Sequence, residues 1–209
     1  MFNDKYSLTQ AVLEGRKTMT RHIITYPSKF RGQNVAGYFV CRRPFGELVE
    51  VCLHDEDERM INGGQIFPKF EVGEIVAIAQ NYRDSGYAPD SLDRHPKDLS
   101  IRGLMKDSAG WNNKMFVKSY ACKHHIKITN VKVERLQDIS DEDCLKEGIY
   151  KGQCGSAYTH FMDAYYYKGD IQPYCTPRSA FAALIDKVSG KGTWESNPYV
   201  WVYEFELFN

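Results

Sequence analysis

Residues 124–136, HHIKITNVKVERL, have the alternating apolar pattern of a β-strand, but the alternation changes phase once along the stretch. Ile126 and Ile128 belong to one phase, whereas Val131 and Val133 belong to the other. The strand must therefore take up one extra residue between Ile128 and Val131. An extra residue of this kind is a β-bulge, which bends the strand that carries it. The stretch predicts a strand that curves around a small β-barrel.

Three other stretches also predict strands. A hairpin is expected over about residues 36–53, because two apolar runs flank the turn-forming sequence Pro-Phe-Gly. Residues 70–80, FEVGEIVAIAQ, contain a strand that is apolar on both faces from Ile75 to Ile78, so we expect it to be buried. The last strand, YVWVYEFEL at residues 199–207, alternates cleanly, and its aromatic face is expected to be core.

Short helices are expected between these strands. Ser7 is placed to cap a helix that stops at Gly15. Ser140, with an acidic residue three positions later, is placed to cap a second helix that ends at Gly148. Thr176, followed directly by proline, opens a third helix. Strands and short helices together predict an α+β fold.

The charge balance of the chain excludes a protein-wide attraction for nucleic acid. The 209 residues include 27 Lys plus Arg and 27 Asp plus Glu, so the formal net charge is zero. A polyanion must therefore be bound by a local patch. Segment 14–43 is such a patch, with seven basic residues and one acid, and the acidic segment 47–58 follows it. With 43% hydrophobic residues, this length suits one globular domain.

The sequence gives no indication of export, membrane attachment or metal binding. The N-terminal sequence MFNDKYSLTQ has no apolar signal core, and no run approaches the roughly 18 apolar residues of a membrane span. The six cysteines are scattered and form no C-x-x-C pair. We expect a cytoplasmic protein with reduced thiols, without metal and without cofactor.

The segment EGRKTMTRH, residues 14–22, gathers basic residues around two threonines directly after the first expected helix. Its Gly15, Lys17 and Thr20 match the ASCH signature Gly-x-Lys-x-x-(Glu or Thr)-x-Arg, and His22 stands where the signature has its arginine. The blocks FEVGEIV, LQDISDEDCLKEGI and YVWVYEFEL follow in the order of that family. The chain therefore resembles an ASCH domain, in the larger form seen in phage and prophage settings.

This resemblance implies a PUA-like small β-barrel with short flanking helices and long insertions. Residues 1–209 are expected to form this single domain, with insertions at about residues 23–69, 81–121 and 150–197. Within the last insertion, the tyrosine-rich stretch 154–174 is expected to be a loop that packs its own aromatic rings.

The resemblance further implies a cleft formed by Lys17, Thr20 and Glu147, because similar proteins remove the acetyl group from acetylated cytidine with these three residue types. Thr20 is then the nucleophile, Lys17 is the base once its pKa has been lowered, and Glu147 is the acid for the leaving amine. If Glu147 instead stays ionised within about 4 Å of Lys17, the two form a salt bridge, and the site binds a ligand without reacting.

Two further functions are open beside the amidohydrolase. One is a non-catalytic PUA-like reader of RNA, and the other is a ribonuclease in which Lys17 works with His22 or His124. Arg21 and His22 point in opposite directions on an extended segment, so Arg21 does not simply replace the arginine of the signature. The partner is a nucleoside or RNA, and the oligomeric state is left open. Its contacts are expected from Arg16, Thr18, Arg21, His22, Arg42 and Arg43.

Overall fold

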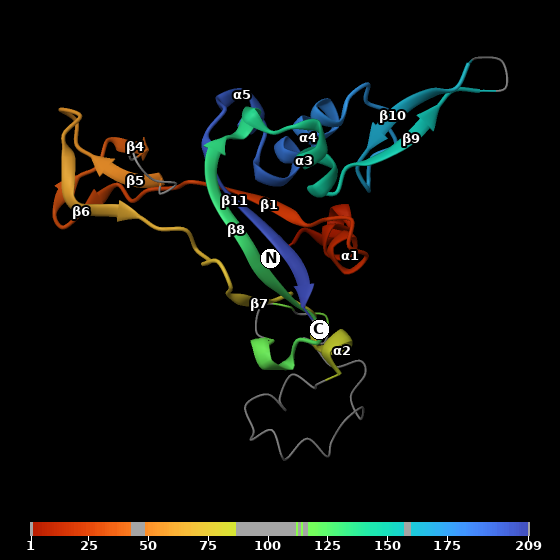
Figure 1. Ribbon diagram of the computed structural model, residues 1–209, viewed down its shortest axis with the longest axis horizontal. Coiled ribbons are helices and arrows are strands. Elements are labelled where there is room, and N and C mark those ends of the chain that lie inside the picture. The colour runs from red at the N-terminus through yellow and green to blue at the C-terminus, as the bar shows by residue number, and fades with distance from the viewer. Residues whose placement is uncertain are drawn as a thin grey trace.

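The protein has an α+β structure whose centre is a four-stranded antiparallel sheet that curls into half a barrel (Figure 1). The computed structural model describes residues 2–42, 49–86, 112, 114, 117–156 and 160–208. In sheet order, the strands are β1 (Met19–Ile23), β11 (Tyr199–Phe208), β8 (His125–Arg135) and β7 (Ile75–Ala77). Within the described residues the two outer strands, β1 and β7, do not pair with each other.

The predicted bulge in β8 is confirmed. Pairing between β8 and β11 steps from Asn130–Glu204 to Ile128–Phe205, which leaves Thr129 without a partner across the strands. The apolar alternation changes phase at this residue, so side chains on both sides of the bulge still face the same core.

Two hydrophobic cores lie on the two faces of the sheet. Trp201, Tyr203 and Phe205 point to one face, which we call the aromatic face, and they are buried as predicted. Val200 and Val202 point to the opposite face, which we call the helix face, and they are completely buried. Helices α3 (Asp141–Lys146) and α4 (Pro177–Ser189) contribute buried side chains to the core on the helix face.

Two of the three predicted helix caps are confirmed. The hydroxyl of Ser140 accepts a hydrogen bond from the Asp143 N–H at the start of α3. Thr176 forms a capping box with Ser179 at the start of α4. Ser7 precedes α1 (Leu8–Leu13), but its backbone is left-handed with φ of 50° and its hydroxyl makes no cap bond. The helix positions were predicted correctly, whereas the capping role of Ser7 was wrong.

Strand β7 differs from the prediction of a fully buried strand. Ile75 is 50% exposed, because β7 is the outer strand of the sheet and pairs only with β8 among the described strands. An apolar run alone does not distinguish a central strand from an edge strand.

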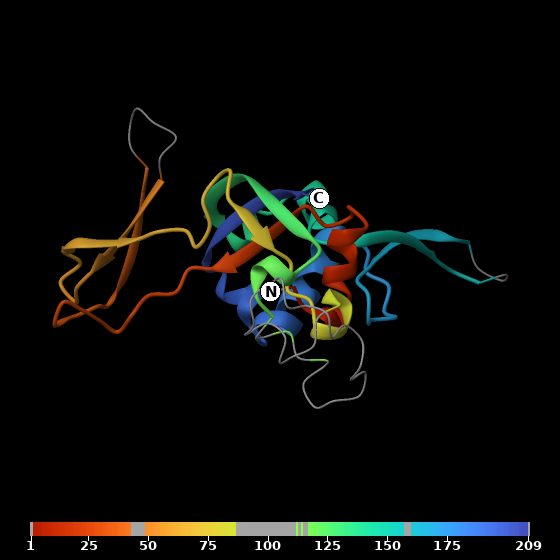
Figure 2. The same ribbon diagram turned by 90° about the horizontal axis from the view of Figure 1, so that it is seen from below.

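Two β-structures project from opposite sides of the body (Figure 2). The first, which we call the arm, is the predicted hairpin extended by a third strand: β4 (Gly37–Arg42), β5 (Val49–His54) and β6 (Met60–Ile66). The second, the ribbon, pairs β9 (Tyr150–Cys154) with β10 (Met162–Tyr166), and β10 lies in the stretch 154–174 for which the sequence predicts a loop.

Smaller elements connect these parts. They are η1 (Asp4–Tyr6), β2 (Lys29–Phe30), β3 (Gln33–Asn34), α2 (Tyr82–Ser85), η4 (Ser119–Ala121), η5 (Leu136–Asp138) and α5 (Thr193–Ser196). Of the helices in the described ranges, none has the length and hydropathy required to cross a lipid bilayer.

Candidate functional site

Lys17 and Glu147 meet where two helices end. After α1, the Lys17 N–H donates to the Ala11 carbonyl, and the next N–H, of Thr18, donates to the Lys146 carbonyl at the end of α3. These backbone bonds bring Lys17 beside Glu147, which follows α3 directly. The two side chains are buried, with 2% and 4% of their surface exposed.

The Lys17 ammonium group has a full set of protein acceptors. It lies 2.5 Å from Oε2 of Glu147, 2.8 Å from the Met19 carbonyl oxygen and 3.0 Å from the Glu147 carbonyl oxygen. An ammonium group has three N–H donors, so none is left for a ligand. The salt bridge considered from the sequence is therefore the arrangement that the structure adopts.

Arg21 completes this buried network. Its Nη1 lies 2.9 Å from Oε1 of Glu147, and its Nη2 lies 2.6 Å from Oε1 of Glu134 on β8. Glu147 therefore sits between two cations, and Arg21 joins it to a second carboxylate. The network links β1, β8 and the end of α3, so its first physical role is to fix the position of these elements.

Burial and neighbouring charges change the protonation of this network. Burial lowers the pKa of Lys17, although Glu147 opposes the shift, and the nearby positive charge of Arg21 lowers it further. Burial also acts to lower the pKa of Arg21, but the carboxylates of Glu147 and Glu134 outweigh it, and the pKa is raised. Arg21 therefore stays charged, and Lys17 is the member of the network whose proton is held least firmly.

Thr20 lies in a different place from Lys17 and Glu147. It pairs with Tyr203 across the sheet and lines a small cavity of about 50 Å³ on the aromatic face, which we call the threonine cavity. Among the described interactions, no hydrogen bond joins Thr20 to Lys17 or Glu147. Phe2 lines this cavity, and its ring centroid lies 5.9 Å from Nζ of Lys17. The structure thus brings two of the three predicted catalytic residues together and places the third, Thr20, in the threonine cavity on the aromatic face.

His22 lines the threonine cavity with Thr20, two positions further along the same face of β1. Its ring makes edge contacts with Tyr203 and Phe70, at centroid distances of 5.2 and 6.3 Å. Burial lowers the pKa of His22, so the imidazole is neutral at pH 7. His22 therefore does not supply the positive charge of the signature arginine, and it faces away from Glu147.

The other predicted contact residues are scattered. Arg16 is exposed and pairs with Glu14, and Thr18 is half-buried, with its backbone bonded to Lys146 and Phe205. Arg42 ends strand β4, whereas Arg43 lies outside the described residues. Among the described side chains, Arg21 is buried in its network and Arg16 is exposed beside Glu14, so these two do not share one basic surface.

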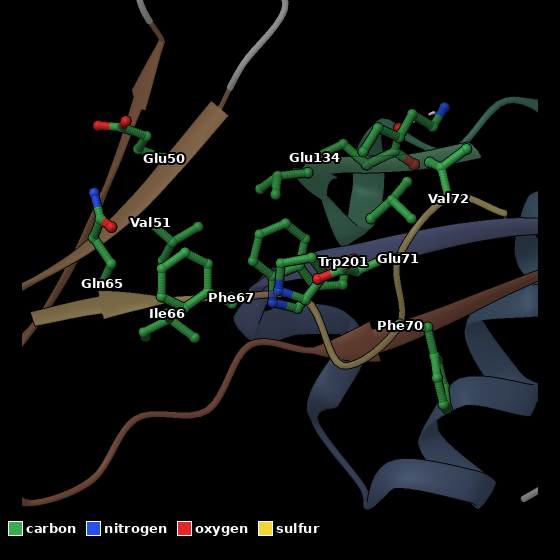
Figure 3. A pocket seen from close by; sticks show the side chains of 14 residues that line it. Glu50, Val51, Gln65, Ile66, Phe67, Phe70, Glu71, Val72, Glu134 and Trp201 are labelled. Atoms are coloured by element: carbon green, nitrogen blue, oxygen red, sulfur yellow. Dashed lines mark ion pairs between the residues drawn. The ribbon is translucent and has the colours of Figure 1, made fainter. Parts of the chain in front are cut away.

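A much larger cavity, of about 640 Å³, separates the arm from the sheet (Figure 3). We call it the arm cavity. Phe67, which is 73% exposed, Phe70 and Trp201 provide aromatic surface, and Val51 and Ile66 face them from the arm. The polar side chains of the lining are Glu50, Gln65, Glu71, Lys132 and Glu134. Glu134 belongs to this lining and also to the Arg21 network.

A third cavity, of about 730 Å³, lies between α1 and residues 79–84. It is polar, and His124 and Lys123 are part of its lining. Within the described ranges, no group of three or more His, Cys, Asp or Glu side chains is arranged to hold a metal ion. His124 and Lys17 therefore belong to separate sites.

Sequence reasoning missed the arm cavity and the partnership of Arg21 with Glu134. The aromatic residues of the cavity come from segments far apart in the chain, so only the folded structure brings them together.

Comparison with known proteins adds no residue to either site, because no family model, no curated protein and no solved structure matches the chain.

Proposed function

We propose that the protein binds a nucleoside, or another ligand with a nucleobase-like ring, in the arm cavity. The observation that carries this proposal is a cavity of about 640 Å³ with aromatic walls and a few polar groups. Pockets for small molecules typically have volumes of roughly 300–1,000 Å³ and this kind of lining. The ligand class agrees with the resemblance to ASCH domains, although that resemblance implies the Lys17, Thr20 and Glu147 cleft as the site, and the arm cavity contains none of these residues. A curled antiparallel sheet with short helices is compatible with a PUA-like barrel, which we propose as the fold.

The charges of the lining favour a neutral ring over a phosphate group. Glu50, Glu71 and Glu134 are acidic, whereas Lys132 is the one basic residue of the described lining. Lys132 also pairs with Glu134 at 3.0 Å. Carboxylates accept hydrogen bonds from exocyclic amines, as glutamate does from N4 of cytosine. Stacking on aromatic side chains accommodates any base.

Removal of one exposed ring tests the proposal. Base stacking on an aromatic side chain contributes about 1–3 kcal/mol, so Phe67→Ala is expected to weaken cytidine binding by roughly 10-fold. Phe161→Ala is the matched control, because Phe161 is similarly exposed, at 64%, but adjoins the ribbon. Isothermal titration of the full chain with cytidine, adenosine and guanosine gives the measurement. Equal losses in the two variants, or no binding of any nucleoside, contradict the proposal.

Amide hydrolysis is the second candidate function, because burial lowers the pKa of Lys17 and the Thr20 hydroxyl has no hydrogen-bond partner among the described residues. Attack by Thr20 on an acetyl carbonyl requires Lys17 to leave its acceptors at Glu147 and Met19 and reach the Thr20 hydroxyl. Chromatography of N4-acetylcytidine after incubation with the protein tests this reaction. Turnover that persists in Thr20→Val removes Thr20 from it.

The RNA reader remains an alternative prediction, as does the ribonuclease. An RNA reader requires several free cations along a backbone path, and its affinity falls steeply with salt. Arg21 is committed to Glu147 and Glu134, and Arg16 pairs with Glu14, so the described contacts favour a single nucleoside over a strand. Titration of a single-stranded oligonucleotide at two salt concentrations distinguishes the two ligands.

A further inference from the structure

The cavity of about 730 Å³ between α1 and residues 79–84, which we call the polar cavity, differs in chemical character from the arm cavity. No Phe, Tyr or Trp belongs to its described lining, whereas the arm cavity is lined by Phe67, Phe70 and Trp201. Its polar lining consists of hydroxyl groups, amides, two carboxylates and four basic side chains. A ligand in this cavity is therefore bound by hydrogen bonds and charge, and not by stacking.

Gln80 places a buried amide in the lining of the polar cavity. The residue is 8% exposed, and its Oε1 accepts a hydrogen bond of 2.5 Å from the Lys123 N–H. Within the described ranges, its Nε2 has no acceptor. Buried polar groups are nearly always paired, so the two N–H donors of this amide indicate an acceptor that a ligand supplies.

The backbone holds Lys123 and His124 beside Gln80. The Ile78 N–H donates to the His124 carbonyl at 2.9 Å, and the Lys123 N–H donates to Gln80, so the two segments run side by side. The Lys123 side chain is exposed, and His124 is half-buried. In the part of the chain that the structure describes, neither side chain has a hydrogen bond or an ion pair. Together with the Gln80 amide they offer N–H donors and positive charge, which an anion requires.

The two carboxylates of the lining limit the charge of the ligand. Asp4 is paired with Lys114 and accepts a hydrogen bond of 2.6 Å from Thr9. Asp84 is exposed and makes no ion pair with a described residue. Its carboxylate accepts a hydrogen bond from a hydroxyl group and repels a second phosphate group. The Ser7 hydroxyl, which makes no cap bond, is a further partner for a hydroxyl group in this cavity.

We propose that the polar cavity binds a small sugar monophosphate. The phosphate group accepts hydrogen bonds from Gln80, Lys123 and His124, and the hydroxyl groups of the sugar contact Ser7 and Asp84. The volume of the cavity lies within the roughly 300–1,000 Å³ of typical small-molecule sites. The inference goes beyond the proposed function and does not depend on it, because the polar cavity and the arm cavity share no lining residue.

Isothermal titration of the full chain with ribose 5-phosphate, inorganic phosphate and ribose tests both halves of the site. We expect ribose 5-phosphate to bind roughly 10-fold more tightly than inorganic phosphate or ribose, because each of these lacks one set of contacts. Its affinity is expected to fall as salt is added. Inorganic phosphate that binds as tightly as ribose 5-phosphate overturns the assignment of a sugar. Absence of ribose 5-phosphate binding overturns the site.

Lys123→Ala tests the phosphate contact, and it is expected to weaken ribose 5-phosphate binding by roughly 10-fold. Lys29→Ala is the matched control, because Lys29 is also exposed and has no ion pair among the described residues. Equal affinities in these two variants contradict the proposed contact.

Gln80→Glu tests the buried amide. Glutamate keeps an oxygen that accepts from the Lys123 N–H, but it replaces the N–H donors with a second acceptor. We expect this variant to lose ribose 5-phosphate binding while its melting temperature shows a folded chain. Wild-type affinity in Gln80→Glu overturns the role of the amide, and Lys123→Ala decides the site if Gln80→Glu does not fold.

Phe67→Ala separates this site from the arm cavity. Because Phe67 does not line the polar cavity, this variant is expected to bind ribose 5-phosphate like the wild-type chain, whatever its effect on cytidine. A loss of ribose 5-phosphate binding in Phe67→Ala places the ligand in the arm cavity and overturns the inference. Failure of every nucleoside to bind removes the proposed function and leaves the polar cavity untouched.

Discussion

Removal of the Glu147 carboxylate is expected to destabilise the protein far more than removal of a surface charge. In Glu147→Ala, Lys17 loses its one carboxylate partner and keeps only two carbonyl acceptors, while Arg21 keeps Glu134. The Lys17 side chain is 2% exposed, so water does not replace the lost partner. Breaking a buried ion pair by removing one member typically costs about 3–5 kcal/mol, and we expect a loss of unfolding free energy in this range.

The assay is urea denaturation at pH 7, followed by circular dichroism, with a double-mutant cycle. Replacing both partners, as in Lys17→Met with Glu147→Leu, is expected to cost about 2 kcal/mol less than the sum of the single changes, because the pair is then lost without leaving a buried charge. Glu14→Gln is the control, since the Glu14–Arg16 pair is exposed, and its midpoint is expected to stay unchanged. A Glu147→Ala midpoint as close to the wild type as that of the control refutes the buried network.

Three further predictions concern stability. The folded-state pKa of His22 lies below its unfolded value of about 6.5, so the unfolded chain binds the proton more readily, and stability is expected to fall as the pH drops through 6.5. Melting curves of His22→Phe between pH 5 and 8 are expected to show a smaller fall in stability than those of the wild-type chain. An unchanged dependence of stability on pH argues against burial of the ring. Gly148 has φ of +104°, and an added Cβ would lie 3.3 Å from Cδ2 of Leu8, so Gly148→Ala is expected to lower the free energy of unfolding by about 1–2 kcal/mol in urea denaturation. An unchanged free energy of unfolding contradicts this backbone geometry. Thr176→Ala is expected to cost about 1 kcal/mol through loss of the capping box, whereas Ser7→Ala costs less because Ser7 makes no cap bond; equal losses contradict the assignment of the caps.

Local patterns in the sequence predicted much of the curled sheet. The phase change in β8 predicted a bulge between Ile128 and Val131, because a single extra residue reverses which side chains face the core, and the structure has it at Thr129. Ser140 and Thr176 marked helix starts because their hydroxyl groups accept backbone N–H bonds at the first turn. Each of these signals depends on residues close together in the chain.

The candidate site was predicted less well than the sheet. Part of the reason is whether an odd or an even number of positions separates two residues on an extended backbone, because this decides whether their side chains share a face. Thr20 lies three residues after Lys17, so an extended backbone sends the two side chains to opposite faces, whereas Arg21, four residues after Lys17, returns to the face of Glu147. The arm cavity could not be predicted from sequence, because its walls come from β5, β6, the β6–β7 connection, β8 and β11. The ribbon was also missed, since polar and tyrosine-rich strands lack a clear apolar alternation.

The proposed nucleoside site is tested most directly by a crystal structure of the full chain soaked with cytidine at saturating concentration. We predict that the base lies in the arm cavity against Trp201 and Phe67, with its exocyclic amine directed to a carboxylate of the lining. The Lys17–Glu147 pair is predicted to remain closed in that structure. A base bound beside an opened Lys17–Glu147 pair, with the arm cavity free of ligand, contradicts the proposal.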